Sequence, residues 1–300
     1  MIGTIDSSVG RRHRLTLGRR EELLGWGFIL PALLIILALI LYPVIYNIYL
    51  SLFRVNLGSA NVWVGFGNYS QILRDTEFWH SVMTTVLYVV FTSLGATAAG
   101  LVVSLAMNRK FPLRALVRGI ILLPYVAPII SVVFAWQFFF DPVNGIFMHV
   151  VYSQLHLIPE RINLIDSPSN AVWIAILFSI WRDFPFAYLM ILARIQAIDA
   201  TLYEAAEIDG CSAWQKFRAI TLPEVFFVIG TLILLRVIWN FNTFEQVYLL
   251  TQNVKVLSVY TYFKAFLGQA DLGQGATIAV VQFLILLAFI LFYLRRVLKW

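Results

Sequence analysis

Two groups of polar residues interrupt apolar stretches of this 300-residue chain. In the first group, Arg182 and Asp183 are neighbours and precede Pro185. A charge at the centre of a bilayer costs about 2.5–3.5 kcal/mol on insertion scales, so such residues usually face a cavity or a partner. Proline frees a backbone carbonyl and can bend its helix toward a cavity. This group therefore predicts a polar path through the apolar part of the protein.

The second group would lie along one face of a later helix. Arg236, Asn240 and Thr243 are spaced i, i+4, i+7, and Trp239 stands beside them. An aromatic ring can stack on the C–H face of a sugar, and an amide can hydrogen-bond to its hydroxyl groups, so this group suits a sugar. The two arginines also suit an anionic solute, such as a sugar phosphate or a glycerophosphodiester. Alternatively, the arginine–aspartate neighbours bond each other or a partner chain, and Asn240 bonds a neighbouring helix.

Other kinds of chemistry have no motif in this sequence. It contains no G-x-x-x-x-G-K-[ST] phosphate loop, no H-E-x-x-H and no G-x-S-x-G. Cys211 is the single cysteine, so a disulfide framework or a multi-cysteine metal site is excluded. The four histidines are scattered over the expected tail and loops, at His13, His80, His149 and His156. We therefore expect no catalytic residue, metal site or cofactor on this chain.

The composition indicates a membrane protein. Apolar residues make up 60% of the chain and charged residues only 13%, against about half and a quarter in soluble domains. A helix needs about 20 apolar residues to cross a bilayer. Six stretches are long enough, which predicts an all-α polytopic membrane protein with six transmembrane helices: about 24–50, 81–107, 119–140, 171–193, 226–250 and 275–294.

Loop charge predicts the orientation, because lysines and arginines stay on the cytoplasmic side. Basic residues are concentrated in the N-terminal tail, after the second and fourth spans, and at the C-terminus. They are Arg11, Arg12, Arg14, Arg19, Arg20, Arg109, Lys110, Arg114, Arg118, Lys216, Arg218, Arg295, Arg296 and Lys299. Both termini are therefore expected in the cytoplasm, with a tail at 1–22 and a membrane domain at 23–300. Topology accounts for the net charge of +6, so nucleic acid is not expected as a partner.

The cytoplasmic loop at about 198–223 reads as two short helices. Thr201 with Glu204 has the spacing of a capping box, and Ser212 with Gln215 repeats it after Gly210, which can take the left-handed conformation that ends the first helix. We expect Pro223 to close the unit. Trp214, Phe217 and Arg218 would share a face of the second helix. That face suits docking of another protein or, alternatively, contact with lipid headgroups, and Glu204 could serve only as a cap.

The same loop resembles the EAA loop of binding-protein-dependent ABC importer permeases. The resemblance rests on Glu204-Ala205-Ala206, Asp209-Gly210 and Ile220-x-Leu222-Pro223. Elsewhere the chain is similar to the sugar-importing branch of that family, whose members include the maltose and glycerol-phosphate permeases. The matching segments are Leu41-Tyr42-Pro43, Gly67-Asn68-Tyr69, Leu123-Pro124 and Trp239-x-Phe241-Asn242-x-Phe244.

The resemblance implies an ABC importer permease (MetI-like) architecture in the cytoplasmic (inner) membrane. It implies a second homologous permease, two ATPase subunits that hold ATP and Mg, and an extracytoplasmic solute-binding protein. The coupling residues would be Glu204, Ala205, Ala206, Asp209, Gly210, Trp214, Phe217, Leu222 and Pro223. The positions matching the family's maltose contacts are Arg182, Asp183, Phe186, Arg236, Trp239, Asn240 and Thr243.

The function expected on these grounds is import of a sugar or sugar-like solute by alternating access, driven by the separate ATPases. An anionic glycerol-phosphate or glycerophosphodiester solute is the alternative cargo. A stand-alone secondary transporter is a further alternative, but it predicts inverted repeats with matching broken helices, and the sequence has no such symmetry.

Overall fold

The computed structural model describes residues 17–56, 58, 60–157 and 160–296. The basic residues Arg11, Arg12, Arg14 and Lys299 lie outside the described residues, as does most of the expected tail at 1–22. Contacts along the chain divide it into two units, Met1–Tyr49 and Leu50–Trp300. All the residues singled out above for a polar path or for coupling belong to the second unit.

The first unit is a long apolar helix with one irregular turn. Helix α1 (Leu17–Ile36) passes through a π-helical turn at Leu37–Leu41 into α2 (Tyr42–Leu50). Its large apolar side chains are exposed, Phe28 and Leu39 among them. Leu24–Leu50 is long and apolar enough to cross a membrane, as the first predicted span requires.

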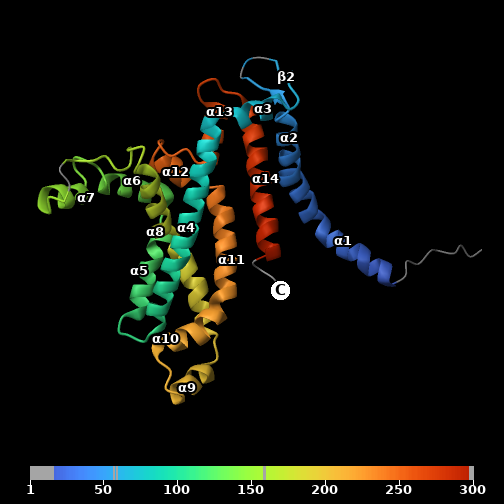
Figure 1. Cartoon of the computed structure of the whole chain (residues 1–300). Helices are drawn as coiled ribbons and strands as arrows, with labels where there is room; N and C mark the ends of the chain where they lie inside the picture. The colour runs from blue at the N-terminus through green and yellow to red at the C-terminus, as the bar shows by residue number, and fades with distance from the viewer. Residues whose placement is uncertain (1–16, 57, 59, 158–159, 297–300) are drawn as a thin grey trace, which may run out of the picture. The chain divides into compact units, whose positions relative to one another are not determined.

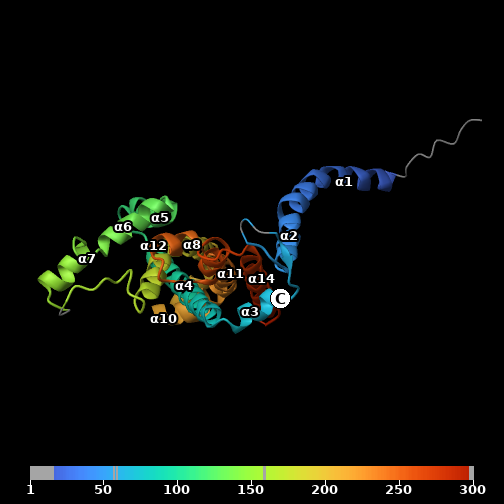
Figure 2. The ribbon, with the colours of Figure 1, turned by 90° about the horizontal axis from the view of Figure 1, so that it is seen from above.

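Three long helices form the centre of the second unit. Helices α4 (Thr76–Asn108), α8 (Ala171–Gln196) and α11 (Leu222–Phe241) lie side by side, and α14 (Leu272–Arg296) lies against α11 (Figures 1 and 2). Gly100 marks a close approach of α4 to the backbone of α8, because a Cβ there would lie 2.6 Å from the Cβ of Ala187 and 2.7 Å from the backbone nitrogen of Tyr188. Small residues at such crossings let membrane helices pack closely.

Shorter elements lie at the two ends of this bundle (Figure 1). One end carries α9 (Ala200–Ile208) and α10 (Ala213–Lys216). The other carries the antiparallel pair β1 (Phe53–Arg54) and β2 (Val62–Trp63), with α3 (Gly67–Arg74) and α13 (Leu257–Phe266). Between the third and fourth spans lie α7 (Ile146–Met148) and a π-helical turn at His149–Gln154.

The third predicted span, 119–140, is not one straight helix. It consists of α5 (Arg114–Val126) and α6 (Ile129–Phe139), which meet at an angle of 95°. The reason is Pro128, whose ring disfavours helical geometry at the preceding residue. Ala127 accordingly has an extended backbone, with φ −64° and ψ 143°. Within the described residues, five helices can span a membrane by length and composition, and six if this bent pair counts as one span.

The fifth predicted span, 226–250, is also interrupted. Helix α11 ends at Phe241, and a separate helix α12 (Glu245–Leu250) follows after a short turn. The turn contains side chains that compete with the helix for backbone groups. Asn242 Nδ2 donates to the carbonyl of Ile238 (2.8 Å), and Thr243 Oγ1 donates to that of Trp239 (3.4 Å). Apolar composition alone did not reveal this break.

Candidate functional site

The loop between α8 and α11 has the two-helix form that its sequence predicts, with a different first cap. Asp199 is the N-cap of α9, because its side chain accepts a hydrogen bond from the amide of Thr201 (3.0 Å). The predicted capping role of Thr201 with Glu204 is therefore wrong. That backbone hydrogen bond lowers the pKa of Asp199 below its ordinary value. Gly210 follows α9 in the left-handed conformation, with φ +74°, as predicted.

The second helix of the loop begins as predicted but does not end at Pro223. Ser212 and Gln215 form a reciprocal capping box at the start of α10. The helix then continues through a π-helical turn at Phe217–Thr221 directly into α11. Leu222 donates to the carbonyl of Phe217 across this wider turn, and Pro223 follows within the first turn of α11, where its missing N–H is tolerated. The loop is therefore covalently and helically continuous with the fifth span.

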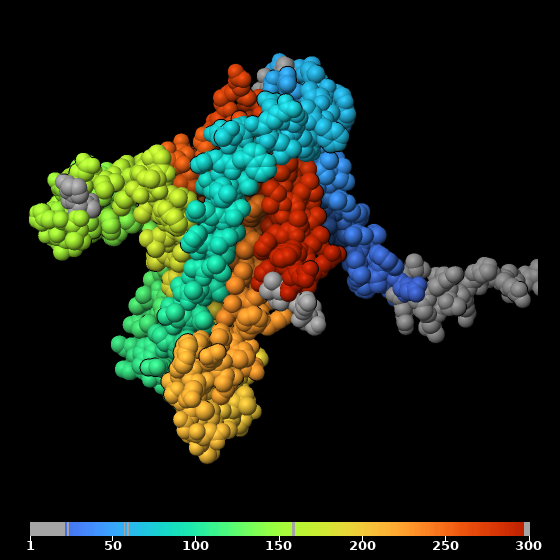
Figure 3. Space-filling view, viewed as in Figure 1, coloured from blue at the N-terminus to red at the C-terminus, as the bar shows by residue number. Residues whose placement is uncertain are grey.

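The loop projects from the end of the bundle, where it is gold in the space-filling view (Figure 3). Apolar side chains are prominent on it: Ile208 is 87% exposed and Trp214 66% exposed. The ring of Trp214 lies 5.4 Å from that of Phe217, which confirms that the two share a face. Glu204, Ala205, Asp209 and Pro223 are exposed, while Ala206, Phe217 and Leu222 are half-buried.

Internal contacts hold the loop in this form. Tyr203 and Thr221 are joined through their hydroxyls (2.8 Å), and Lys216 forms an ion pair with Glu207 (2.7 Å). The ion pair and its hydrogen bond lower the pKa of Glu207. Because these contacts use none of the exposed apolar side chains, the Ile208 and Trp214 surfaces remain available for a partner.

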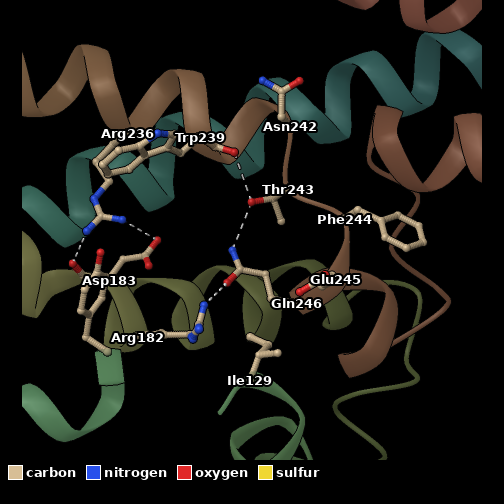
Figure 4. A pocket seen from close by; sticks show the side chains of 11 residues that line it. Ile129, Arg182, Asp183, Arg236, Trp239, Asn242, Thr243, Phe244, Glu245 and Gln246 are labelled. Atoms are coloured by element: carbon tan, nitrogen blue, oxygen red, sulfur yellow. Dashed lines mark hydrogen bonds and ion pairs between the residues drawn. The ribbon is translucent and has the colours of Figure 1, made fainter. Parts of the chain in front are cut away.

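A second candidate site is a cavity of about 680 Å³ inside the second unit (Figure 4). It lies where α8 and α11 meet the breaks in the third and fifth spans. The broken elements supply part of its wall, because Tyr125 and Ile129 flank the break in the third span and residues 242–246 lie at the break in the fifth. Its lining consists of Tyr125, Ile129, Arg182, Asp183, Arg236, Trp239, Asn242, Thr243, Phe244, Glu245 and Gln246.

Asp183 of α8 pairs with Arg236 of α11 rather than with its neighbour in sequence. Arg236 Nη1 lies 3.2 Å from Asp183 Oδ2, and Nη2 donates to the backbone carbonyl of the same residue (2.6 Å). The guanidinium also lies 5.1 Å from the ring of Phe186 and 5.4 Å from that of Trp239. Consecutive helical residues point in different directions, so Arg182 cannot face Asp183.

Arg182 has a neutral partner instead. Its Nη1 donates to Oε1 of Gln246 at 3.4 Å, and among the described residues it forms no ion pair. Its Nε is buried without a hydrogen-bond partner in the described part of the chain. The cavity therefore contains one paired guanidinium, that of Arg236, and one whose charge is not neutralised by direct contact.

The structure brings together five of the seven residues predicted to form the path: Arg182, Asp183, Arg236, Trp239 and Thr243. Phe186 is not part of the lining, but its ring lies 5.4 Å from that of Trp239, which is. Asn240 is buried elsewhere, and its Nδ2 donates to Ser93 Oγ of α4 (3.1 Å). That contact matches the alternative in which Asn240 joins two helices.

Sequence reasoning missed six lining residues: Tyr125, Ile129, Asn242, Phe244, Glu245 and Gln246. The Ala127-Pro128 step was the available sign that the third span breaks beside Tyr125 and Ile129. Glu245 was visible as a charge within an apolar stretch. Nothing in the pattern distinguished Gln246, because its importance depends on contacts with residues far away in the chain.

Comparison with known proteins places the chain in a family. Residues 92–299 match the model of the binding-protein-dependent transport system inner membrane component. The chain is 42% identical to the inner membrane ABC transporter permease protein YcjO of Escherichia coli over 287 residues, 95% of this chain and 98% of that protein. It is 32% identical to the trehalose/maltose transport system permease protein MalF of Thermococcus litoralis, over 92% of this chain and 94% of that protein.

The fold also has a counterpart of known structure. A chain of a bacterial alginate ABC transporter, crystallised with an alginate pentasaccharide-bound periplasmic protein, superposes with a TM-score of 0.82 at 22% identity. The match covers 95% of this chain and 98% of the other. The chain is therefore a multi-pass, inner-membrane permease subunit of an ABC importer, and this transport subunit lacks an ATPase domain. It belongs to the family of binding-protein-dependent transport system inner membrane components.

Proposed function

We propose that the solute carried by this permease is a sugar or a sugar-like molecule, and that it passes the Arg182–Trp239 cavity. The observation that carries the proposal is the chemistry of the lining. Trp239 is 45% exposed and Tyr125 39% exposed, so aromatic rings are available to stack on a sugar ring. Asn242, which is exposed in the lining, supplies an amide that can bond hydroxyl groups.

The charges of the lining favour an uncharged solute. Two guanidiniums, Arg182 and Arg236, are balanced by two carboxylates, Asp183 and Glu245. A site for a strongly anionic solute would have an excess of positive charge. The names of relatives support the same class: one is a trehalose/maltose permease and another, from Mycobacterium tuberculosis, a trehalose permease.

An anionic glycerol-phosphate or glycerophosphodiester solute is the second candidate. It is favoured by Arg182, which forms no ion pair among the described residues. A relative from Agrobacterium fabrum, 32% identical, is named as a permease for sulfoquinovosyl glycerol. The two candidates differ in the charge of the solute, so competition between trehalose and glycerol 3-phosphate for uptake distinguishes them.

For energy coupling, we propose that the loop at 198–223 docks on a separate ATPase subunit. The loop exposes two large apolar side chains, Ile208 and Trp214, which suit an apolar groove on the partner. It also exposes Glu204, which suits a basic residue there. The helical continuity of α10 with α11 offers a rigid route from that surface to Arg236 and Trp239 in the cavity. Two ATPase subunits with ATP and Mg, a sister permease, and a solute-binding protein complete the proposed assembly, with both termini in the cytoplasm.

Reconstitution tests this proposal. The permease is co-purified with its sister permease and ATPase, placed in liposomes with ATP inside, and supplied with the solute-binding protein and radiolabelled trehalose. Uptake should require ATP and should fall in Trp239→Ala, which loses the stacking ring. Uptake that persists without any ATPase subunit would support a stand-alone transporter instead. Uptake of glycerol 3-phosphate in preference to trehalose would support the anionic alternative.

A further inference from the structure

A chain of buried hydrogen bonds connects the cavity to the interior of the bundle. Tyr88 of α4 and Ser179 of α8 are fully buried, and Gln246 of α12 is 7% exposed. Gln246 Nε2 donates to the hydroxyl of Tyr88 (2.9 Å), and this hydroxyl lies 2.6 Å from Ser179 Oγ. Ser179 in turn donates to the carbonyl of Ala175 (2.8 Å). Three helices distant in sequence therefore meet in one continuous network.

The protons of this network can be assigned by counting. A serine hydroxyl has one proton, and that of Ser179 is used on Ala175, so Tyr88 must donate to Ser179. The Tyr88 oxygen is then left as an acceptor, which requires the NH₂ of Gln246. The second hydrogen of this NH₂ points to Thr243 Oγ1 (3.3 Å), whose own proton goes to a backbone carbonyl. One orientation of the Gln246 amide satisfies all these groups.

This orientation directs the amide oxygen of Gln246 at Arg182. A guanidinium has only donors, so a reversed amide would place NH₂ against it and leave the Tyr88 oxygen without a donor. Figure 4 shows Gln246 between Arg182 and Thr243. Buried polar groups whose partners are all satisfied are held rigidly. Asp183, by contrast, is occupied with Arg236 and does not hold Arg182.

We propose that Gln246 is a positioning residue for solute recognition: locked by Tyr88 and Ser179, it holds the Arg182 guanidinium at the cavity wall. The proposal rests on the proposed function, in which solute passes this cavity. Arg182 then meets the solute with donors in a fixed place, because among the described residues no carboxylate binds its guanidinium directly. Tyr88 and Ser179 act through Gln246 and have no need to touch the solute.

The test uses the assembled transporter with two single variants, Tyr88→Phe and Gln246→Met. Tyr88→Phe removes the acceptor that orients the amide while keeping the ring, and Gln246→Met removes the amide at similar length. Tyr293→Phe is the matched control, because its hydroxyl also makes a buried hydrogen bond, to the carbonyl of Gly230 (2.8 Å), away from the cavity lining. The measurements are the KM and Vmax for trehalose uptake and the Arg182 position in cryo-microscopy maps.

We expect about a five- to tenfold higher KM in Tyr88→Phe with little change in Vmax, since one well-made hydrogen bond is lost. Gln246→Met should have a similar effect, and the double variant should add little to it, because both changes remove the same support. The maps should show Arg182 displaced in both variants. Tyr293→Phe should lower thermal stability but keep the wild-type KM and the Arg182 position.

Three results would overturn the proposal. The first is an unmoved Arg182 in Tyr88→Phe and Gln246→Met. The second is a displaced Arg182 with wild-type uptake kinetics. The third is an equal rise in KM for Tyr293→Phe, which would indicate general destabilisation. If the wild type does not transport trehalose, this particular cargo is wrong, and the position of Arg182 in the maps alone decides the positioning role.

Discussion

Arg236 holds Asp183 through both its carboxylate (3.2 Å) and its backbone carbonyl (2.6 Å), and so ties α11 to α8 at the wall of the cavity. Both side chains are almost completely buried, at 3% and 8% exposure. Removing one partner of such a pair leaves an uncompensated charge, which is far more costly than removing both. The pair therefore supports the fold as well as the cavity.

Arg236→Met should destabilise the permease by about 3–5 kcal/mol, because Asp183 is left buried and unpaired. The double variant Arg236→Met with Asp183→Leu should recover much of that loss. The apparent melting temperature of the purified complex measures both effects. If the double variant were as unstable as the single one, the ion pair would not be the cause of the loss.

Glu204→Lys should abolish uptake while the protein still inserts into the membrane, if the exposed face of α9 docks on an ATPase. Glu207→Gln is the control on the same helix, because it removes only a surface ion pair with Lys216, and exposed ion pairs contribute little to stability. ATPase co-purification and ATP-driven uptake are the measurements. Normal values for both in Glu204→Lys would contradict docking through this loop.

Gly100→Ala should force α4 and α8 apart. The new Cβ would lie 2.6 Å from Ala187 Cβ and 2.7 Å from the backbone nitrogen of Tyr188, which cannot move without the helix. Overpacking of this kind costs about 1–3 kcal/mol. Gly119→Ala is the control, since a Cβ there meets nothing within 4 Å and alanine favours helix. Thermal stability should fall in the first variant and hold or rise in the second.

Asn240→Ala and Trp239→Ala should separate structural from solute-binding roles. Asn240 donates to Ser93 on α4, so its loss should lower stability by about 1 kcal/mol and leave the concentration dependence of uptake unchanged. Trp239 lines the cavity, so its loss should raise the KM for the sugar. A raised KM in Asn240→Ala, with stability unchanged, would return Asn240 to the solute path.

Asp75, just before α4, should make stability depend on pH. Burial by itself would raise its pKa, but hydrogen bonds from Tyr260 (2.7 Å), Lys264 (2.9 Å) and the Glu77 amide (2.9 Å) outweigh burial, and the pKa is lowered. A carboxylate whose pKa is lower in the folded state contributes its full stabilisation at pH values above its pKa in the unfolded chain, which is near 3.9. That stabilisation is lost as the pH falls through the folded-state pKa.

Asp75→Asn should therefore be less stable than wild type at pH 7, and the difference should shrink in acid below about pH 4. Melting temperatures of both proteins across this range are the check. A difference that stays constant from neutral to acid pH would show that the carboxylate charge is not what stabilises this cluster.

The sequence by itself determined the class of the protein, most of its spans and the two-helix form of the loop at 198–223. Long apolar stretches are a local property, and so are the Ser212–Gln215 cap and the left-handed Gly210. Tertiary structure decided the cavity. The packing of α4, α8, α11 and α12 decides which partner each polar side chain meets. It pairs Asp183 with Arg236 rather than with Arg182. It also directs Asn240 to Ser93 rather than to the solute, and brings Gln246 to Tyr88. Hydrogen bonds and ion pairs act over a few ångströms, and no spacing along one segment specifies which distant side chain will lie within that reach.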